Sequence, residues 1–251
     1  MILPPFYDNT QQGAPISGTP SDAFLPDKTN TTMKRIMLLL LAALLLLPAA
    51  AASIKPVTKV LFIGDSMTGW LSERLEAYGA ENGFEVTTVT WDGSTPAKWA
   101  KTGKLTQYIN QYKPDVIFIN LGMNQLLDRN PSKSLAAPMA TLLKSVGSIP
   151  LVWIGPLEWP GKGKGEALVN YLKKTVEAAP NGHFYNASDL QIPRQSKTNP
   201  HPTRDGSRIM VDHIVKWLPT TGIPFKSLNA PKGEQMKRGK VFIYKRMNQP
   251  L

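Results

Sequence analysis

Residues 57–66 read VTKVLFIGDS, an almost unbroken apolar run that closes with Gly64-Asp65-Ser66. A short run rich in branched and aromatic residues is typical of a strand buried on both faces of a parallel sheet. Apolar residues then recur every three or four positions from Met67 to Tyr78, which predicts a helix directly after the strand. The stretch therefore predicts the first strand and helix of an α/β fold.

The same alternation continues along the chain. Five strands, each followed by a helix, predict a three-layer α/β/α sandwich with a five-stranded parallel sheet, which is flavodoxin-like. The C-terminal tail, residues 220–251, is basic and turn-rich, and within it only residues 240–244 (KVFIY) resemble a strand, either at a sheet edge or in a loose arm. The predicted strands cover residues 57–63, 84–90, 115–121, 150–154 and 183–186, and the helices lie around residues 67–78, 105–112, 134–146, 165–178 and 205–218.

Ligands of such sheets bind beyond the carboxyl ends of the strands. Ser66 follows the first strand at a helix N-terminus, where free N–H groups favour negative charge, although a serine there can equally be a helix cap. Gly93 and Asn124 follow the second and third strands, where a backbone or amide N–H can stabilise an oxyanion, or else they serve as a turn glycine and a capping residue. The loop before the last helix contains His201, whose imidazole can reach the same edge.

The remaining composition excludes several kinds of site. The sequence has no cysteine, which rules out a disulfide scaffold, an iron–sulfur centre and a cysteine nucleophile. With three histidines in all, a multi-histidine zinc site is not expected. His183 starts a strand and His213 lies within a helix, so both are interpreted as structural. Residues 161–165 (GKGKG) lack the spacing and the Ser/Thr of a phosphate-binding loop. No metal or cofactor is expected.

Four segments, Gly64-Asp65-Ser66, Gly93, Gly122-Met123-Asn124 and His201-Pro202, resemble in order the four motif blocks of the SGNH (GDSL-type) hydrolases. The resemblance covers residues 57–218. It implies Ser66 as the nucleophile and His201 as the general base. It also implies an oxyanion hole formed by the backbone N–H groups of Ser66 and Gly93 and the amide of Asn124, with acyl transfer through a serine ester.

Two positions depart from the family pattern. Thr198 stands where the family has an aspartate three residues before the histidine, so the orienting carboxylate is in doubt. We expect a Ser–His dyad steadied by a backbone carbonyl. Asp189 is the alternative orienting acid, and Asp205 is a further candidate that is better interpreted as a cap of the last helix. Gln125 replaces the aspartate that commonly follows the asparagine, which bears on loop geometry.

The N-terminal region has the features of an export signal. Basic residues Lys34 and Arg35 precede a twelve-residue apolar run, residues 36–47, which is followed by Pro48 and four alanines. This order predicts a secretory signal peptide over residues 33–52 and a periplasmic or secreted protein, with an uncleaved anchor as the alternative. Residues 1–32 are expected to be a disordered extension from a misassigned start. The hydrolase domain is then residues 53–219.

The net charge is +11, and residues 1–52 contain three acidic and three basic residues, so their removal leaves this charge unchanged. For an exported protein, this charge favours an anionic envelope polymer over nucleic acid as a partner, or a solvated basic surface with no partner. The basic run from Lys232 to Arg246 is interpreted as a solvated arm or a contact for such a polymer. Trp159 is a candidate for stacking on a sugar, whereas Trp91 and Trp99 are interpreted as packing residues.

Together these features predict a monomeric, exported serine esterase that cleaves a small acetyl-like ester of an envelope carbohydrate or lipid. Two alternatives remain open: an acyltransferase that uses the same serine, and a non-catalytic envelope-binding module, for which Thr198 is the support. A flavodoxin-like nucleotide or flavin binder lacks the phosphate-cradling loop.

Overall fold

The computed structural model describes residues 28–45 and 55–251. The predicted extension, residues 1–32, and the signal cleavage site near residues 50–52 fall largely or wholly outside these ranges. Residues 28–45 form helix α1 (Lys28–Leu45), which contains most of the predicted apolar run. No helix in the described ranges has the length and apolar character needed to cross a membrane.

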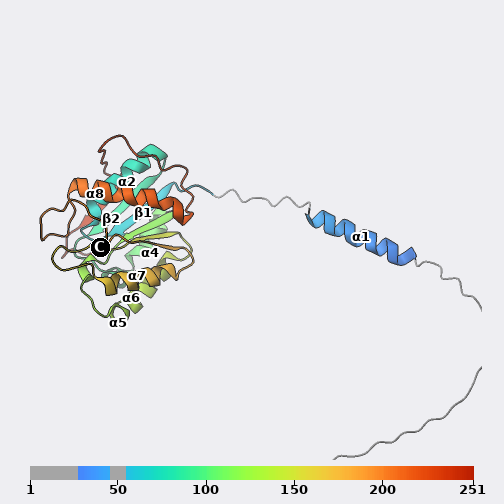
Figure 1. Ribbon diagram of the computed structural model, residues 1–251, viewed down its shortest axis with the longest axis horizontal. Coiled ribbons are helices and arrows are strands. Elements are labelled where there is room, and N and C mark those ends of the chain that lie inside the picture. Colours follow the sequence, from blue (N-terminus) through green and yellow to red (C-terminus); the bar gives the residue numbers. More distant parts are fainter. Residues whose placement is uncertain (1–27, 46–54) are drawn as a thin grey trace, which may run out of the picture. The chain divides into compact units, whose positions relative to one another are not determined.

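Residues 55–251 form an α/β domain that contains one six-stranded sheet (Figure 1). All five strand pairings are parallel, and the strand order is β5-β4-β3-β1-β2-β6. The strands are β1 (Lys59–Gly64), β2 (Glu85–Trp91), β3 (Val116–Asn120), β4 (Leu151–Ile154), β5 (Gly182–Tyr185) and β6 (Val241–Lys245). The five predicted strands are confirmed within a few residues, and the tail adds the sixth.

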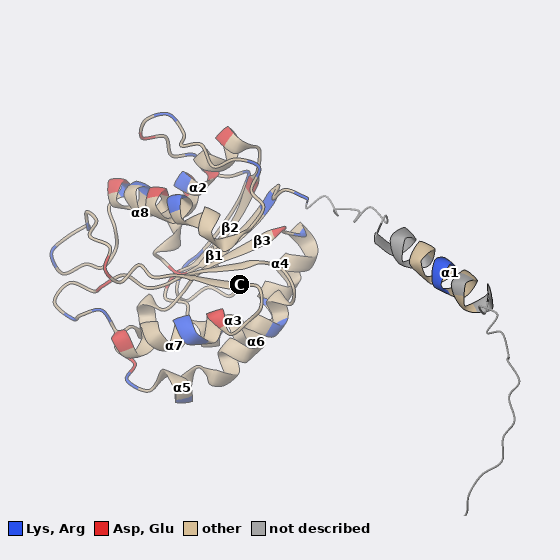
Figure 2. Cartoon of the chain, turned by 45° about the vertical axis from the view of Figure 1, so that its right-hand side comes forward, with Lys and Arg blue, Asp and Glu red and all other residues tan. Residues whose placement is uncertain are grey.

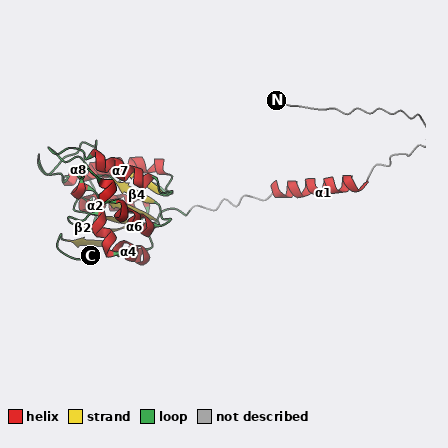
Figure 3. Ribbon diagram, turned by 90° about the horizontal axis from the view of Figure 1, so that it is seen from below, coloured by secondary structure: helices red, strands yellow, loops and turns green. Residues whose placement is uncertain are grey.

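Helices cover both faces of the sheet, as Figure 3 shows from below. Helices α2 (Thr68–Asn82) and α8 (Arg204–Trp217) pack together on one face. The opposite face is covered by α3 (Pro96–Thr102), α4 (Lys104–Tyr112), α5 (Pro131–Ser134), α6 (Ala136–Val146) and α7 (Glu166–Glu177). Two short 3₁₀ helices, η1 (Met123–Gln125) and η2 (Leu218–Thr221), complete the domain.

Two hydrophobic cores follow from the alternation of side chains along the strands. In β1, Val60 and Phe62 face the core beneath α2 and α8, whereas Leu61 and Ile63 face the core beneath α3, α4, α6 and α7. All four side chains are almost fully buried. Because β1 is central and covered on both faces, it reads as a continuous apolar run rather than as an alternating one.

The C-terminal tail is docked on the domain, so the alternative of an edge strand is confirmed and the loose arm is wrong. Residues Thr87–Trp91 of β2 pair in register with β6. Arg238 forms an ion pair with Glu73 at 3.1 Å, and Lys240 pairs with Glu85. Figure 2 shows the remaining Lys and Arg residues on several helices and loops of the domain.

Candidate active site

Ser66 lies in the tight turn between β1 and α2. Gly64 is required there, because a Cβ atom at this position would lie 2.0 Å from Thr68 Oγ1 and 2.5 Å from the Asn120 carbonyl oxygen. Asp65 is fully buried, and its carboxylate accepts a hydrogen bond from the Met67 N–H at 3.0 Å. The turn therefore fixes Ser66 at the carboxyl end of the central strand.

His201 reaches Ser66 from the loop before α8. Its Nε2 atom lies 2.9 Å from Ser66 Oγ, although the two residues are 135 positions apart. This is hydrogen-bond distance, as a serine nucleophile and its base require. The predicted pairing of these two residues is therefore present in the fold.

Asn199 orients the imidazole, a role that the sequence had not assigned to it. Its Oδ1 atom lies 2.7 Å from His201 Nδ1 and also accepts the His201 backbone N–H at 2.9 Å. The Asn199 Nδ2 group donates to Gln195 Oε1 at 3.2 Å, which fixes which end of the amide faces the ring. Because Oδ1 can only accept, Nδ1 has to carry the proton and Nε2 is left free to accept the Ser66 hydroxyl proton.

The side chains considered for this orienting role lie elsewhere. The Asp189 carboxylate pairs with Lys164, and Asp205 pairs with Arg208 Nη2 at 2.6 Å. The cap of α8 is Thr203, whose Oγ1 accepts the Gly206 N–H at 3.0 Å, so the assignment of Asp205 as the cap was wrong. The side-chain oxygen of Asn199, two residues before His201, takes the place expected for a backbone carbonyl or for Asp189.

Trp159 supports the loop that contains Asn199 and His201. Its Nε1 group donates to the Thr198 carbonyl oxygen at 3.0 Å, and the Lys162 ammonium lies 3.9 Å from its ring centroid. Trp159 is not among the residues that line the cavity at Ser66. Its contacts therefore give it a role in supporting this loop, and its stacking on a substrate stays a prediction. Trp91 and Trp99 are buried, in agreement with packing.

The predicted oxyanion donors lie around the same turn. Gly93 has φ +62°, a left-handed conformation that favours glycine. Among residues 55–251, no acceptor is within hydrogen-bond range of the backbone N–H of Ser66 or of Gly93. Asn124 Nδ2 donates to Asp65 Oδ2 at 3.1 Å and to the Ser94 carbonyl oxygen at 3.0 Å. Asn124 thus links Asp65 to Ser94. Because both N–H groups of its amide are used in these bonds, it can donate to an oxyanion only by sharing one of them.

Burial governs the protonation of two groups at the site. It raises the pKa of Asp65 to about 7, although the hydrogen bond from Met67 opposes this shift. Burial also lowers the pKa of His201, while the negative charge of Asp92 opposes the decrease. A lowered pKa keeps the imidazole neutral near pH 7, which is the form that can accept a proton.

Replacing Asn199 with aspartate is expected to raise the pKa of His201 by about 1 unit, since a carboxylate next to the ring favours its charged form. Titration of the His201 ring protons by NMR measures this shift without requiring activity. Asn199→Ala is the matched control, because it removes the acceptor without adding charge. Equal His201 pKa values in the Asp and Ala variants would contradict the assigned contact.

A cavity of about 430 Å³ opens at Ser66 and His201. Its walls include Trp70 of α2 together with Phe242 and Tyr244 of β6, none of which the sequence had singled out as site residues. Trp70 lies in the predicted helical stripe, yet its side chain is 39% exposed. The likeness of residues 240–244 to a strand was the only signal for the other two. Within the described ranges, no group of acidic or histidine side chains is arranged to hold a metal ion.

No protein-family model and no curated protein matches this sequence. Solved structures resemble the fold. A psychrotrophic esterase, EstA from Pseudoalteromonas sp., has a TM-score of 0.53 and 22% identity, covering 64% of this chain and 99% of its own. A family 3 carbohydrate esterase from Clostridium thermocellum has a TM-score of 0.53 and 16% identity, covering 67% and 98%. A lipolytic protein of the G-D-S-L family from Desulfitobacterium hafniense has a TM-score of 0.50 and 17% identity, covering 62% and 97%. This likeness, together with the four motif segments at one edge of the sheet, shows that the chain has the fold of the SGNH hydrolases.

Proposed function

We propose that this chain is an exported serine esterase that removes a small acyl group from an envelope carbohydrate. The observation that carries the proposal is the contact of Ser66 Oγ with His201 Nε2 at 2.9 Å, in a ring whose other nitrogen is held by Asn199. A hydroxyl, a neutral base and a residue that orients the base are the parts of an activated serine nucleophile.

In the proposed mechanism, His201 Nε2 takes the proton of Ser66 while Oγ attacks the ester carbonyl carbon. The backbone N–H groups of Ser66 and Gly93 stabilise the resulting oxyanion, and one such donor contributes roughly 3–4 kcal/mol. The imidazolium then protonates the leaving alcohol as the C–O bond breaks, which leaves an acyl-serine. Water attacks this ester with His201 again as base, and the acid leaves with Ser66 regenerated.

Two observations support a small acyl group. Next to the main cavity, across Met67 and Pro202, lies a second cavity of only about 10 Å³. Its walls are largely apolar and include Leu71, Met123 and Met210. A cavity of this volume holds at most about one water molecule, so it has no room for a long acyl chain.

Carbohydrate as the alcohol part and an envelope location are supported less directly. The similar structures include family 3 carbohydrate esterases, from Clostridium thermocellum and from Talaromyces cellulolyticus. Basic residues followed by an apolar run at residues 34–47 support a periplasmic or secreted location.

Covalent labelling tests the proposed nucleophile. A fluorophosphonate probe is expected to add once to the folded protein, and peptide mass spectrometry is expected to place the adduct on Ser66. Acid that protonates His201 is expected to slow the labelling, because the base can then no longer accept the hydroxyl proton. Labelling elsewhere, or none at neutral pH, would count against a serine esterase.

A further inference from the structure

The C-terminal strand forms one wall of the cavity at Ser66. Arg238, Phe242 and Tyr244, which we term the C-terminal wall, line this cavity together with Ser66 and His201. The cavity therefore joins the two ends of the domain's sequence, because Ser66 follows the first strand and the wall belongs to the last strand. The register of β6 on β2 sets the position of the wall, with Thr88 opposite Phe242 and Thr90 opposite Tyr244.

Strand periodicity explains which side chains face the cavity. Phe242 and Tyr244 are two residues apart and share a face of β6. Ile243, between them, points to the other face and packs against the core beneath α3 and α4. Trp70 of α2 is a further aromatic side chain in the cavity lining. The cavity therefore presents three aromatic rings.

Charged groups are interleaved with these rings. The Arg238 guanidinium lies 4.4 Å from the Phe242 ring centroid and forms an ion pair with Glu73, which also lines the cavity. The Tyr244 hydroxyl donates to the Asp92 carboxylate, another cavity residue.

One further polar group in the lining lacks a partner. The Ser207 side chain is fully buried, and its hydroxyl has no hydrogen-bond partner among residues 28–45 and 55–251.

We propose that the C-terminal wall binds the alcohol half of the ester, and that this half is a sugar ring. A sugar presents apolar C–H faces and a rim of hydroxyls. This pattern matches aromatic rings alternating with carboxylates and a guanidinium, whereas a fatty-acyl chain would cover those charged groups with apolar surface and offer them no hydrogen bond. The inference rests on the proposed esterase function, for which it names the residues that determine specificity.

The test compares two esters of the same acyl group. The substrates are an acetylated methyl glucoside and p-nitrophenyl acetate, and the readout is the ratio of their kcat/KM values. Phe242→Ala and Tyr244→Ala are each expected to lower the preference for the glucoside about tenfold, since each removes an aromatic contact from the ring. Lys245→Ala, on the same strand but outside the cavity lining, is expected to leave the ratio unchanged.

Two further measurements separate this inference from the esterase assignment. Methyl glucoside without an acetyl group is titrated against the Ser66→Ala protein by NMR, and Tyr244→Ala in that background is expected to weaken binding. Melting temperatures show that the variants remain folded. An unchanged ratio and unchanged binding in folded variants would overturn the inference. The inference would also be overturned if the wall variants changed the preference between p-nitrophenyl acetate and p-nitrophenyl octanoate but left the preference for the glucoside unchanged. If the wild-type protein hydrolysed neither ester but still bound the glucoside at the wall, only the esterase assignment would be overturned.

Discussion

Replacing Ser66 with alanine is expected to lower kcat for p-nitrophenyl acetate by roughly 10⁶-fold, as for other enzymes that lose a serine nucleophile. The alanine leaves His201 with no hydroxyl to activate, because Ser66 Oγ is the atom 2.9 Å from its Nε2. Ser66→Ala combined with His201→Ala is expected to lose little more than either change alone, since the two residues act as one unit. Steady-state kinetics of the three variants measures both effects.

Ser132→Ala is the matched control for this prediction, because Ser132 is exposed on α5 and its hydroxyl bonds Asn130 at 3.1 Å. It is expected to keep wild-type kcat. If the Ser66→Ala protein retained more than a tenth of wild-type activity, Ser66 would not be the nucleophile. Hydrolysis would then have to proceed without an acyl-serine.

The fold was largely predictable because its central strands are buried on both faces. The runs at residues 57–63 and 115–121 have no polar alternation, which indicates a parallel sheet with helices on each side. The sixth strand was harder to predict, because β6 lies at the sheet edge and its burial is incomplete. What holds β6 in place is a contact with β2 some 150 residues earlier, and no local pattern in the sequence encodes this contact.

The contact between Ser66 and His201 was predictable, and the residue that orients the imidazole was not. Ser66 directly follows the first strand and His201 lies in the loop before the last helix, both on the side where ligands of such sheets bind. Asn199 acts through the shape of its loop, in which Arg194 Nη1 donates to the Pro200 carbonyl oxygen at 2.6 Å and Trp159 holds Thr198. The family pattern places a carboxylate at position 198. In the folded loop it is the next residue, Asn199, that turns toward the His201 ring.

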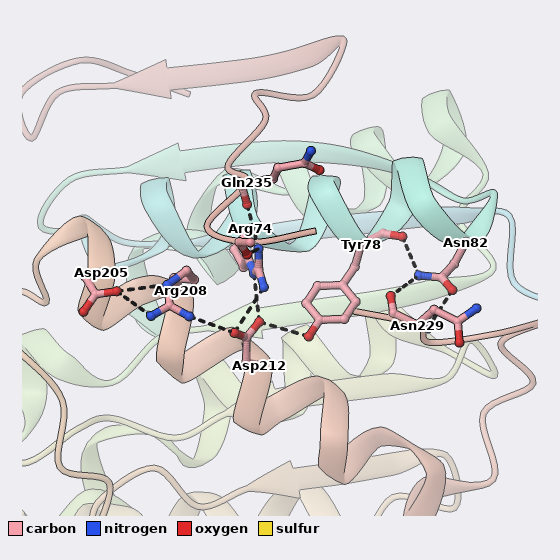
Figure 4. Close-up of polar contacts among 9 residues, drawn as sticks. Arg74, Tyr78, Asn82, Asp205, Arg208, Asp212, Asn229 and Gln235 are labelled. Atoms are coloured by element: carbon pink, nitrogen blue, oxygen red, sulfur yellow. Dashed lines mark hydrogen bonds and ion pairs between the residues drawn. The ribbon is translucent and has the colours of Figure 1, made fainter. Parts of the chain in front are cut away.

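Arg74 connects the fold to the proposed specificity site. Its side chain is only 2% exposed, and its Nε and Nη2 atoms donate to the Asp212 carboxylate at 2.8 and 3.2 Å (Figure 4). Its Nη1 atom donates to the carbonyl oxygens of Gly233 and Gln235 at 3.2 and 2.9 Å, which fastens the chain leading to β6 onto α2. The guanidinium thus satisfies a carboxylate and two backbone groups at once.

Replacing Arg74 with leucine is expected to lower the free energy of unfolding by about 3 kcal/mol, because Asp212 loses its bidentate partner and two carbonyl groups lose their donor. For a domain of this size, that loss corresponds to a decrease of roughly 6–12 °C in Tm. Urea unfolding followed by circular dichroism measures the first quantity and calorimetry the second. The variant is also expected to increase amide hydrogen exchange in β6, since the segment that precedes the strand loses its anchor.

Arg208→Leu provides a stringent comparison for the last prediction, because Arg208 contacts the same Asp212 carboxylate, at 3.4 Å, from a more exposed position. Exposed ion pairs contribute about 1 kcal/mol or less, so this variant is expected to lie within that amount of the wild-type protein. Arg208→Leu also removes the ion pair with Asp205 at 2.6 Å, so an excess loss in Arg74→Leu is a lower bound on what the hydrogen bonds to Gly233 and Gln235 and the burial of the guanidinium contribute. Equal losses in the two variants would mean that the hydrogen bonds from Arg74 to Gly233 and Gln235 add nothing to holding the tail. Arg74 would then have no part in placing the C-terminal wall beside Ser66.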